Sequence, residues 1–312
     1  MGPLRRVYGG GGRPVVTLLL LVACALAPVA DAAPRPPSRS WPLLPPAGPG
    51  DRILVVAPHV DDEAIAAAGF LADALRRQAQ VSVVYMTAGD NNRTSAKILE
   101  FTLGPSKADL LKIGQRRIRE ARTAMARLGV PADRLYLLGY PDRGLQPMLE
   151  HPDELLRSPG TGRTTIPYPE ALSPGAEHRL ANLQADLRRV LDQVRPTLVL
   201  LPVDFDTHPD HGASGRIVLP LLRELAETPR VLGYLVHARD FPRPFLPSVR
   251  SPLLPPPQLA GRPWVVFPLS PAQEELKGRV LTAYRSQRAD PYLLLLTNAF
   301  IRRNELFLPL EP

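Results

Sequence analysis

The sequence predicts an α/β protein with a Rossmann-like, open and mainly parallel sheet, helices on both faces, and a single domain. Short apolar runs typical of buried strands alternate along the chain with longer segments of helical pattern. Strands that alternate with helices pair in parallel, because each helix crosses back over the sheet to the next strand. The 312 residues, 45% of them hydrophobic, suit one sizeable core.

Three strands and two helices are expected in the first half of the domain. The strands are apolar runs bounded by polar or turn residues, and the helices carry alanine, leucine and charged residues. In chain order these elements are a strand over 53–57, a helix ending near 77, a strand over 81–87, a helix through 114–129 and a strand over 134–138.

The second half continues the alternation between two long loops. The loops cover 146–175 and 241–263, are rich in proline, glycine or serine, and are long enough to be functional rather than mere connectors. The expected elements are a helix over 176–194, a strand over 197–202, a helix over 212–227, a strand over 230–237 and a last helix over 271–287.

Residues 1–32 have the pattern of a signal peptide. Three arginines precede an apolar run over 15–30, which ends on small residues suited to cleavage and is short for a bilayer span. Residues 21–24 resemble the lipobox of bacterial lipoproteins, which would make Cys24 a lipidated membrane tether; an ordinary signal peptide that contains a cysteine is the alternative. Residues 33–50 are proline-rich and predict a spacer before a domain over 51–312. The protein is therefore expected to be exported, either periplasmic, extracellular or membrane-anchored.

Charge and cysteine content exclude several classes of site. The net charge is +8, but the basic residues are dispersed and no aromatic-basic motif or zinc finger is present, so a nucleic-acid partner is not expected. Cys24 is the single cysteine, so the mature chain has neither disulfides nor a cysteine-ligated metal.

Chemistry is concentrated where the first strand ends, in the sequence PHVDDE. His59 is followed by Asp61, Asp62 and Glu63 at the carboxyl end of a predicted strand, which is where α/β sheets form their sites. A dinucleotide-binding turn would need glycines there, and none is present. Histidine and carboxylate side chains instead favour a metal, since both are zinc ligands.

A second motif, THPDH, follows the strand over 197–202. It places His208 and His211 at another strand end, so that His59, Asp62 and His211 could surround one metal ion. This arrangement would leave Asp61 and His208 free to act on water and on a substrate carbonyl.

The two motifs together resemble the zinc-dependent de-N-acetylase family, called LmbE-like or PIG-L-like, which includes N-acetylglucosaminyl deacetylases. The similarity covers 52 to about 308 and includes the softer features TAGD, GYPD and AYRSQ. Val60 departs from the proline usual in the family. The position only shapes the turn, so the implied chemistry is unaffected.

This resemblance implies a role for each motif residue. His59, Asp62 and His211 would bind Zn²⁺, with Fe²⁺ or another divalent metal as an alternative. Asp61 would be the general base toward water that the metal acidifies. Two further catalytic residues are implied: a protonated His208, which would stabilise the oxyanion or assist the leaving amine, and Asp210, which would orient the His208 ring.

Three residues are weaker candidates for substrate binding. Arg117 matches a family arginine, although it could equally lie on a solvated helix face or pair with Glu120. Asp142 follows a strand and could merely cap a turn, and His237 closes the strand over 230–237. His178 is expected on an exposed helix face, and Glu63 in the first turn of a helix.

The implied function is hydrolysis of the N-acetyl group of an N-acetylated amino sugar. Export favours an extracytoplasmic glycan or glycolipid containing N-acetylglucosamine as substrate. The alternatives are an amidase of the same site with a different N-acyl substrate, or a sugar-binding module without catalysis; an intact Asp61 and His208 argue against the module. The sequence does not determine the oligomeric state.

Overall fold

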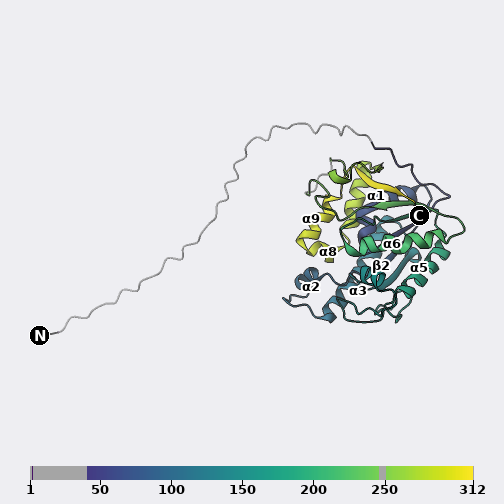
Figure 1. Cartoon of the computed structure of the whole chain (residues 1–312). Helices are drawn as coiled ribbons and strands as arrows, with labels where there is room; N and C mark the ends of the chain where they lie inside the picture. The colour runs from purple at the N-terminus through teal and green to yellow at the C-terminus, as the bar shows by residue number, and fades with distance from the viewer. Residues whose placement is uncertain (1, 3–40, 246–250, 312) are drawn as a thin grey trace. The chain divides into compact units, whose positions relative to one another are not determined.

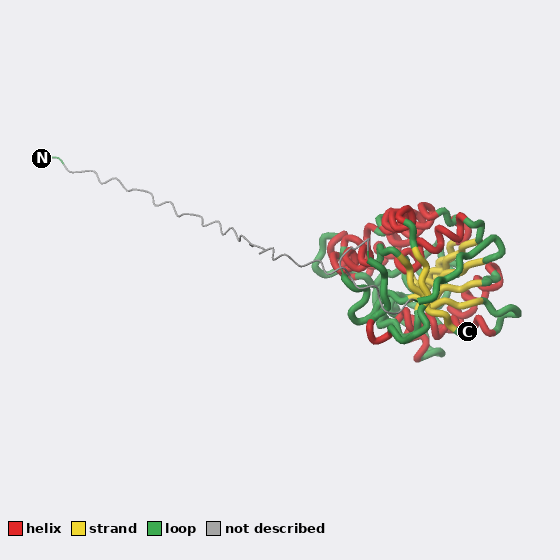
Figure 2. Tube along the Cα trace, turned by 90° about the horizontal axis from the view of Figure 1, so that it is seen from above, coloured by secondary structure: helices red, strands yellow, loops and turns green. Residues whose placement is uncertain are grey.

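A seven-stranded, mainly parallel sheet forms the centre of the computed structural model (Figures 1 and 2), which describes residues 2, 41–245 and 251–311. The strand order is β3-β2-β1-β4-β5-β7-β6. The strands are β1 (Arg52–Ala57), β2 (Gln80–Thr87), β3 (Leu135–Tyr140), β4 (Leu198–Pro202), β5 (Arg230–Tyr234), β6 (Val265–Pro268) and β7 (Asn304–Leu310). Strands β1 to β5 pair in parallel and β7 is antiparallel to both neighbours, which confirms the predicted fold class.

Helices cover the sheet in two groups (Figure 2). Helices α1, α3 and α7 contact one another, and α6 contacts both α4 and α5. The helices are α1 (Asp62–Arg76), α2 (Arg93–Leu99), α3 (Lys107–Leu128), α4 (Leu145–Glu150), α5 (Leu180–Val194), α6 (Pro209–Arg223), α7 (Pro271–Leu281), α8 (Arg285–Ala289) and α9 (Pro291–Ala299), with short 3₁₀ turns at Ala132–Arg134 and Pro257–Leu259. One large core surrounds the central strands, and a separate small cluster of Ala96, Leu110 and Ile113 lies between α2 and α3.

The strand order reverses between β1 and β4, which are hydrogen-bonded neighbours. Segments that leave the carboxyl ends of these two strands turn to different sides of the sheet, and a crevice opens between them. The fold therefore brings the loop after Ala57 beside the loop after Pro202.

The last ten residues of the predicted linker belong to the folded unit. Leu44 donates its backbone N–H to the carbonyl of Val266 at 2.8 Å, and Val266 donates to the carbonyl of Pro42 at 2.9 Å. The side chain of Leu44 is buried. The segment therefore extends the sheet at β6, and the compact unit begins at Trp41 rather than at residue 51.

His178 is not on an exposed helix, contrary to the sequence-based expectation. Helix α5 begins only at Leu180, because the preceding residues pair with the long loop: His178 donates its backbone N–H to the carbonyl of Thr164 at 2.9 Å. Its side chain is buried against Tyr140.

The predicted signal peptide, apart from Gly2, and the lipobox cysteine lie outside the described residues. Within the described part of the chain, no helix is both long and apolar enough to cross a membrane.

Candidate active site

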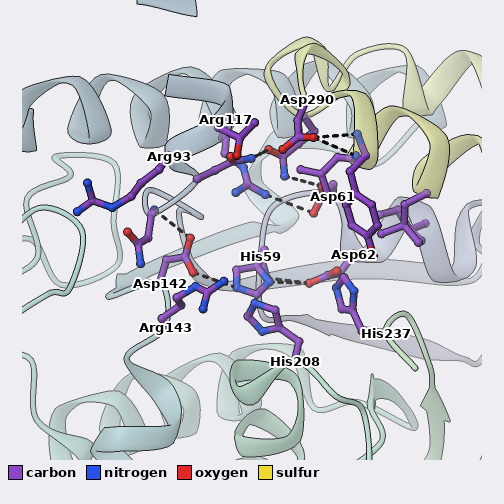
Figure 3. A pocket seen from close by; sticks show the side chains of 18 residues that line it. His59, Asp61, Asp62, Arg93, Arg117, Asp142, Arg143, His208, His237 and Asp290 are labelled. Carbon is purple, nitrogen blue, oxygen red and sulfur yellow. Dashed lines mark hydrogen bonds and ion pairs between the residues drawn. The ribbon is translucent and has the colours of Figure 1, made fainter. Parts of the chain in front are cut away.

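Seven of the nine predicted site residues line one pocket at the carboxyl end of the sheet (Figure 3). The other two, Asp210 and His211, are fully buried and contact His59 from outside the lining. The volume of the pocket is about 570 Å³. His59 and Asp61 enter it from the turn after β1, His208 from the turn after β4, and Asp142 from the turn after β3. Other lining residues come from α2 and its N-terminus, from α3, and from α8 and α9.

Three ligand atoms form a compact triangle in this site. The Oδ2 of Asp62 lies 3.4 Å from the Nδ1 of His59 and 3.2 Å from the Nε2 of His211, and these two nitrogens are 3.3 Å apart. Zinc bonds of about 2.0–2.1 Å in tetrahedral geometry separate neighbouring ligand atoms by about 3.3–3.4 Å. The donor set and its spacing therefore fit a divalent metal with a fourth position open.

Carboxylates hold the outer nitrogen of each histidine in the triangle. The Nε2 of His59 lies 3.4 Å from Asp142 Oδ1 and 3.3 Å from Asp210 Oδ2. The Nδ1 of His211 lies 3.2 Å from Asp206 Oδ2. Such carboxylates fix the tautomer and orientation of a ligating ring, so the inner nitrogens are presented to the metal position.

The same carboxylates favour positive charge in the site. Burial alone lowers the pKa of His211, but Asp62 and Asp206 outweigh it and raise the pKa to about 10. His59 behaves alike: burial opposes its charge, yet hydrogen bonds to neighbouring carboxylates raise its pKa well above the usual value. The negative charge of these carboxylates would also stabilise a bound divalent cation. The cation would displace the protons from the two histidines, since ligands bind metals in their unprotonated form.

Asp61 stands beside the triangle in a strained backbone conformation. Its φ of 148° and ψ of −21° are rare for residues other than glycine. One carboxylate oxygen accepts from Gln287 Nε2 at 2.9 Å, and the other lies 3.4 Å from Arg117 Nη2. Two neighbours therefore fix the orientation of this carboxylate inside the pocket.

Burial tunes the acidity of Asp61 and of its neighbour Glu63. Burial raises the pKa of Asp61 to about 6, partly offset by the charge of Arg117. Glu63 is fully buried, accepts from Tyr85, Tyr284 and the backbone N–H of Asp61, and has a pKa raised by burial to about 8. Glu63 therefore supports the backbone of Asp61, a role that its place in the first helical turn did not suggest.

Arg117 points inward and is not on a solvated helix face. It is 3% exposed and donates to the carbonyl of Gly89 at 2.6 Å, whereas Glu120 bonds to Ser286. A Cβ at Gly89 would lie 1.9 Å from Arg117 Nη1, and φ there is +62°, so the close approach needs glycine.

His208 and Asp210 are arranged differently from the family-based expectation. The Nδ1 of His208 accepts the backbone N–H of Asp210 at 3.3 Å, as the N-cap of α6. The Asp210 carboxylate accepts from the backbone of Arg143 and Leu145 and contacts His59 instead of the His208 ring. With Nδ1 as acceptor, a neutral His208 carries its proton on Nε2, and burial together with neighbouring histidines keeps its pKa low, at about 2.

His237 also lines the pocket, although β5 ends before it at Tyr234. Its ring centroid lies 4.8 Å from that of His211, and Asp62, His211 and His237 form a second group that could hold a metal. His237 therefore lies close enough to bind either the metal or a substrate group.

Asp206 and Gln287 are site residues that sequence reasoning missed. Asp206 accepts from His211 and from three backbone N–H groups, of His208, Val236 and His237. A second aspartate in DFDTHPDH, just before the predicted ligands, was the available signal. Gln287 had no local signal beyond the motif AYRSQ, because its contact with Asp61 spans 226 residues.

Two curated proteins are similar to this chain. The 1D-myo-inositol 2-acetamido-2-deoxy-alpha-D-glucopyranoside deacetylase of Nakamurella multipartita is 34% identical over 193 residues, which is 59% of this chain and 59% of that protein. The probable N-acetyl-alpha-D-glucosaminyl L-malate deacetylase 2 of Bacillus anthracis is 25% identical over 185 residues, 59% of this chain and 65% of that protein. The match thus spans less than two thirds of either relative.

Solved structures share the fold. A conserved protein of Thermus thermophilus superposes with a TM-score of 0.50 at 22% identity, covering 84% of this chain and 95% of that one. The N,N'-diacetylchitobiose deacetylase of Pyrococcus horikoshii gives 0.51 at 17% identity, covering 84% of each chain.

Residues 54–222 match the family model described as GlcNAc-PI de-N-acetylase, PIG-L. The matched region is more than half of the chain and contains both motifs and the whole ligand triangle. The chain therefore belongs to the PIG-L family of de-N-acetylases.

Proposed function

We propose that this protein hydrolyses the N-acetyl group of an N-acetylglucosamine-type amino sugar. The observation that carries the proposal is the position of Asp61, a buried carboxylate with a raised pKa beside three convergent metal-ligand atoms. A structural or sugar-binding role needs no base at this point. The names of the two curated relatives, both deacetylases of glucosaminides, support the same reaction.

Each residue has a part in amide cleavage. A divalent metal, for which we propose zinc, would be held by His59, Asp62 and His211 and would supply Lewis-acid polarisation and a more acidic water. Asp61 accepts a proton from the attacking water while the water oxygen bonds to the carbonyl carbon. The Nε2–H of His208 donates to the carbonyl oxygen as it becomes negative. The C–N bond then breaks, the amine takes the proton from Asp61, and acetic acid leaves and loses its remaining proton to solvent.

The neutral state of His208 suits this role. Its Nδ1 accepts a backbone N–H, so the ring has one donor, Nε2–H, for the substrate and need not carry a second proton. A neutral imidazole can act as an electrophile of this kind when its pKa is held low. The structure therefore favours oxyanion stabilisation by a hydrogen bond over a protonated histidine.

We also propose that the substrate lies outside the cytoplasm, as an extracytoplasmic glycan or glycolipid. The support is the signal-peptide pattern of residues 1–32 and the lipobox around Cys24. Lipidation would raise the mass of the mature chain, and both globomycin and Cys24→Ala would abolish this increase. Cleavage near residue 32 in both proteins would instead show an ordinary signal peptide.

Acetate release from a panel of N-acetylglucosamine conjugates tests the reaction. The zinc-loaded protein should release acetate, and Asp61→Asn should lose at least a hundredfold in rate while it retains the metal. The matched control is Asp204→Asn, an exposed aspartate of the β4 turn, which should act like the parent. Equal rates for the parent and Asp61→Asn would refute the mechanism. No release despite bound metal would refute deacetylation and favour another acyl group or a binding role.

A further inference from the structure

The loop that follows α2 carries two fully exposed apolar side chains. Phe101 is 96% exposed and Leu103 is 95% exposed, the highest values for large hydrophobic residues in the described part of the chain. Ile98, on the last turn of α2, is 41% exposed. Single exposed hydrophobic residues are ordinary, but a group this exposed on one short loop indicates a partner surface.

The backbone shows that Phe101 is there at a cost to stability. Its φ is +50°, and Thr102 donates its N–H to the carbonyl of Lys97 at 3.0 Å, which closes the end of α2 in the manner of a Schellman motif. Glycine is the residue preferred at the left-handed position of that motif. A phenylalanine in a strained conformation, with its side chain in solvent, contributes no packing energy to the fold. We therefore expect the stabilising contact of this side chain to come from a partner outside the chain.

The loop lies one short helix away from the pocket. Asn92, Arg93 and Thr94, at the start of α2, line the pocket, and the seven residues of α2 span roughly 10 Å. Helix α2 contacts α8, and α8 contacts α9, so the three lie along one side of the molecule (Figure 1). Helix α9 adds Tyr292, which is 57% exposed and lines the pocket, and Leu295, which is 38% exposed.

Cations flank the exposed loop. Arg93, Lys97 and Lys107 are exposed and make no ion pair among the residues that the structure describes. The two nearby carboxylates are already neutralised: Glu100 lies 3.5 Å from both Lys112 and Arg116, and Asp109 lies 3.0 Å from Lys112. Apolar side chains surrounded by unpaired cations are complementary to an anionic lipid surface.

We propose that Phe101 and Leu103 insert into the surface of an anionic membrane and turn the pocket toward it. The apolar side chains enter the boundary between headgroups and acyl chains, and Arg93, Lys97 and Lys107 contact the headgroups. This docking is separate from catalysis and holds whether or not the proposed deacetylation is correct. If both hold, the substrate is an amino sugar presented at a membrane.

A tryptophan reporter in the full-length chain tests local insertion, independently of any tether at the N-terminus. In Phe101→Trp, vesicles of phosphatidylglycerol and phosphatidylcholine should shift the tryptophan emission to the blue, and brominated lipid should quench it. The matched control is Gln80→Trp, which should show neither effect. Gln80 is exposed at the start of β2 and so lies at the amino end of the parallel strands, opposite the end that carries the pocket. Vesicles of phosphatidylcholine alone should give a several-fold weaker signal.

A second pair of variants separates docking from a structural role. Leu103→Trp serves as reporter, alone and combined with Phe101→Gly. The glycine should raise the urea midpoint of unfolding, because it suits the left-handed position, and yet reduce quenching by brominated lipid at least tenfold.

Three results would overturn the proposal. One is vesicle binding of Phe101→Trp without a change in its emission. Another is an emission shift that depends on protein concentration and needs no vesicles, which would show that a second copy of the chain covers the loop. The third is unchanged quenching after Phe101→Gly.

Discussion

Replacing Asp206 with asparagine should weaken metal binding while leaving the three ligands in place. Oδ2 of Asp206 receives His211 Nδ1 at 3.2 Å and the backbone N–H groups of Val236 and His237 at 3.0 Å each. Oδ1 receives the backbone N–H of His208 at 2.9 Å. Asparagine will place its single oxygen where three donors converge, so its NH₂ group faces a fourth donor and the negative charge near His211 is lost.

The expected loss follows from that geometry. Removing the outer hydrogen-bond partner of a metal-ligating histidine typically costs 10- to 100-fold in metal affinity, which is about 1.4–2.8 kcal/mol. Competition with a chromophoric chelator would measure the zinc affinity of Asp206→Asn, of the parent and of the control Asp204→Asn, in the exposed part of the same turn. An affinity of Asp206→Asn equal to that of the parent would show that the carboxylate does not act on the metal through His211.

Three further outcomes are expected. The free energy of unfolding should be about 1 kcal/mol higher for Asp61→Gly than for Asp61→Asn, because glycine accepts a φ of 148° without strain. Urea titration of both variants would measure the difference, and a less stable glycine variant would contradict the argument from strain. With Asp61 as base, kcat/KM should fall as pH drops through about 6, where its carboxylate becomes protonated, and a profile flat down to pH 5 would exclude Asp61. The metal-free protein should lose stability as pH rises from 4.5 through about 8, because the Glu63 side chain holds its proton more tightly in the folded protein than in the unfolded chain. Glu63→Gln should flatten this dependence of stability on pH. An unchanged dependence would assign it to other groups.

The sequence predicted that His59, Asp62 and His211 converge because its information on them is local. His59 and Asp62 share one turn, and His211 lies in the first turn of the helix that follows an evident apolar strand. The step that joins the two turns, adjacency of β1 and β4, follows from the general topology of doubly wound sheets. Predicting the fold class and the convergence of these three residues therefore needed no knowledge of long-range contacts.

The outer partners of the ligands could not be predicted in the same way. The family resemblance implied that Asp210 orients His208, but residues two apart at a helix start do not face each other. The Asp210 carboxylate instead meets His59, 151 residues away in the chain, and Gln287 reaches Asp61 from a helix after the last predicted loop. Such pairs are set by how α6 and α8 pack, which no local pattern contains.

The edge of the sheet was missed for a different reason. Strands β6 and β7 are short or proline-containing and pair antiparallel, so neither resembles the buried parallel strands before them. Residue Glu305 of β7 nevertheless accepts from the backbone of Gly69 and Phe70 in α1 and from Lys277 in α7. The edge thereby anchors the helix whose first turn carries Asp62.

The interlocked carboxylates imply that the site is organised before a metal arrives. His59, from the turn after β1, is held by Asp142 from the turn after β3 and by Asp210 from α6, so three separate turns are tied to one ring. His211 is held in turn by Asp206, which also fixes the segment after β5. Each tie uses the nitrogen that faces away from the metal position, so none must break when a cation enters. Metal binding should therefore replace protons at the inner atoms and leave the turns unmoved, and the electrostatic cost of gathering these carboxylates becomes affinity for the cation.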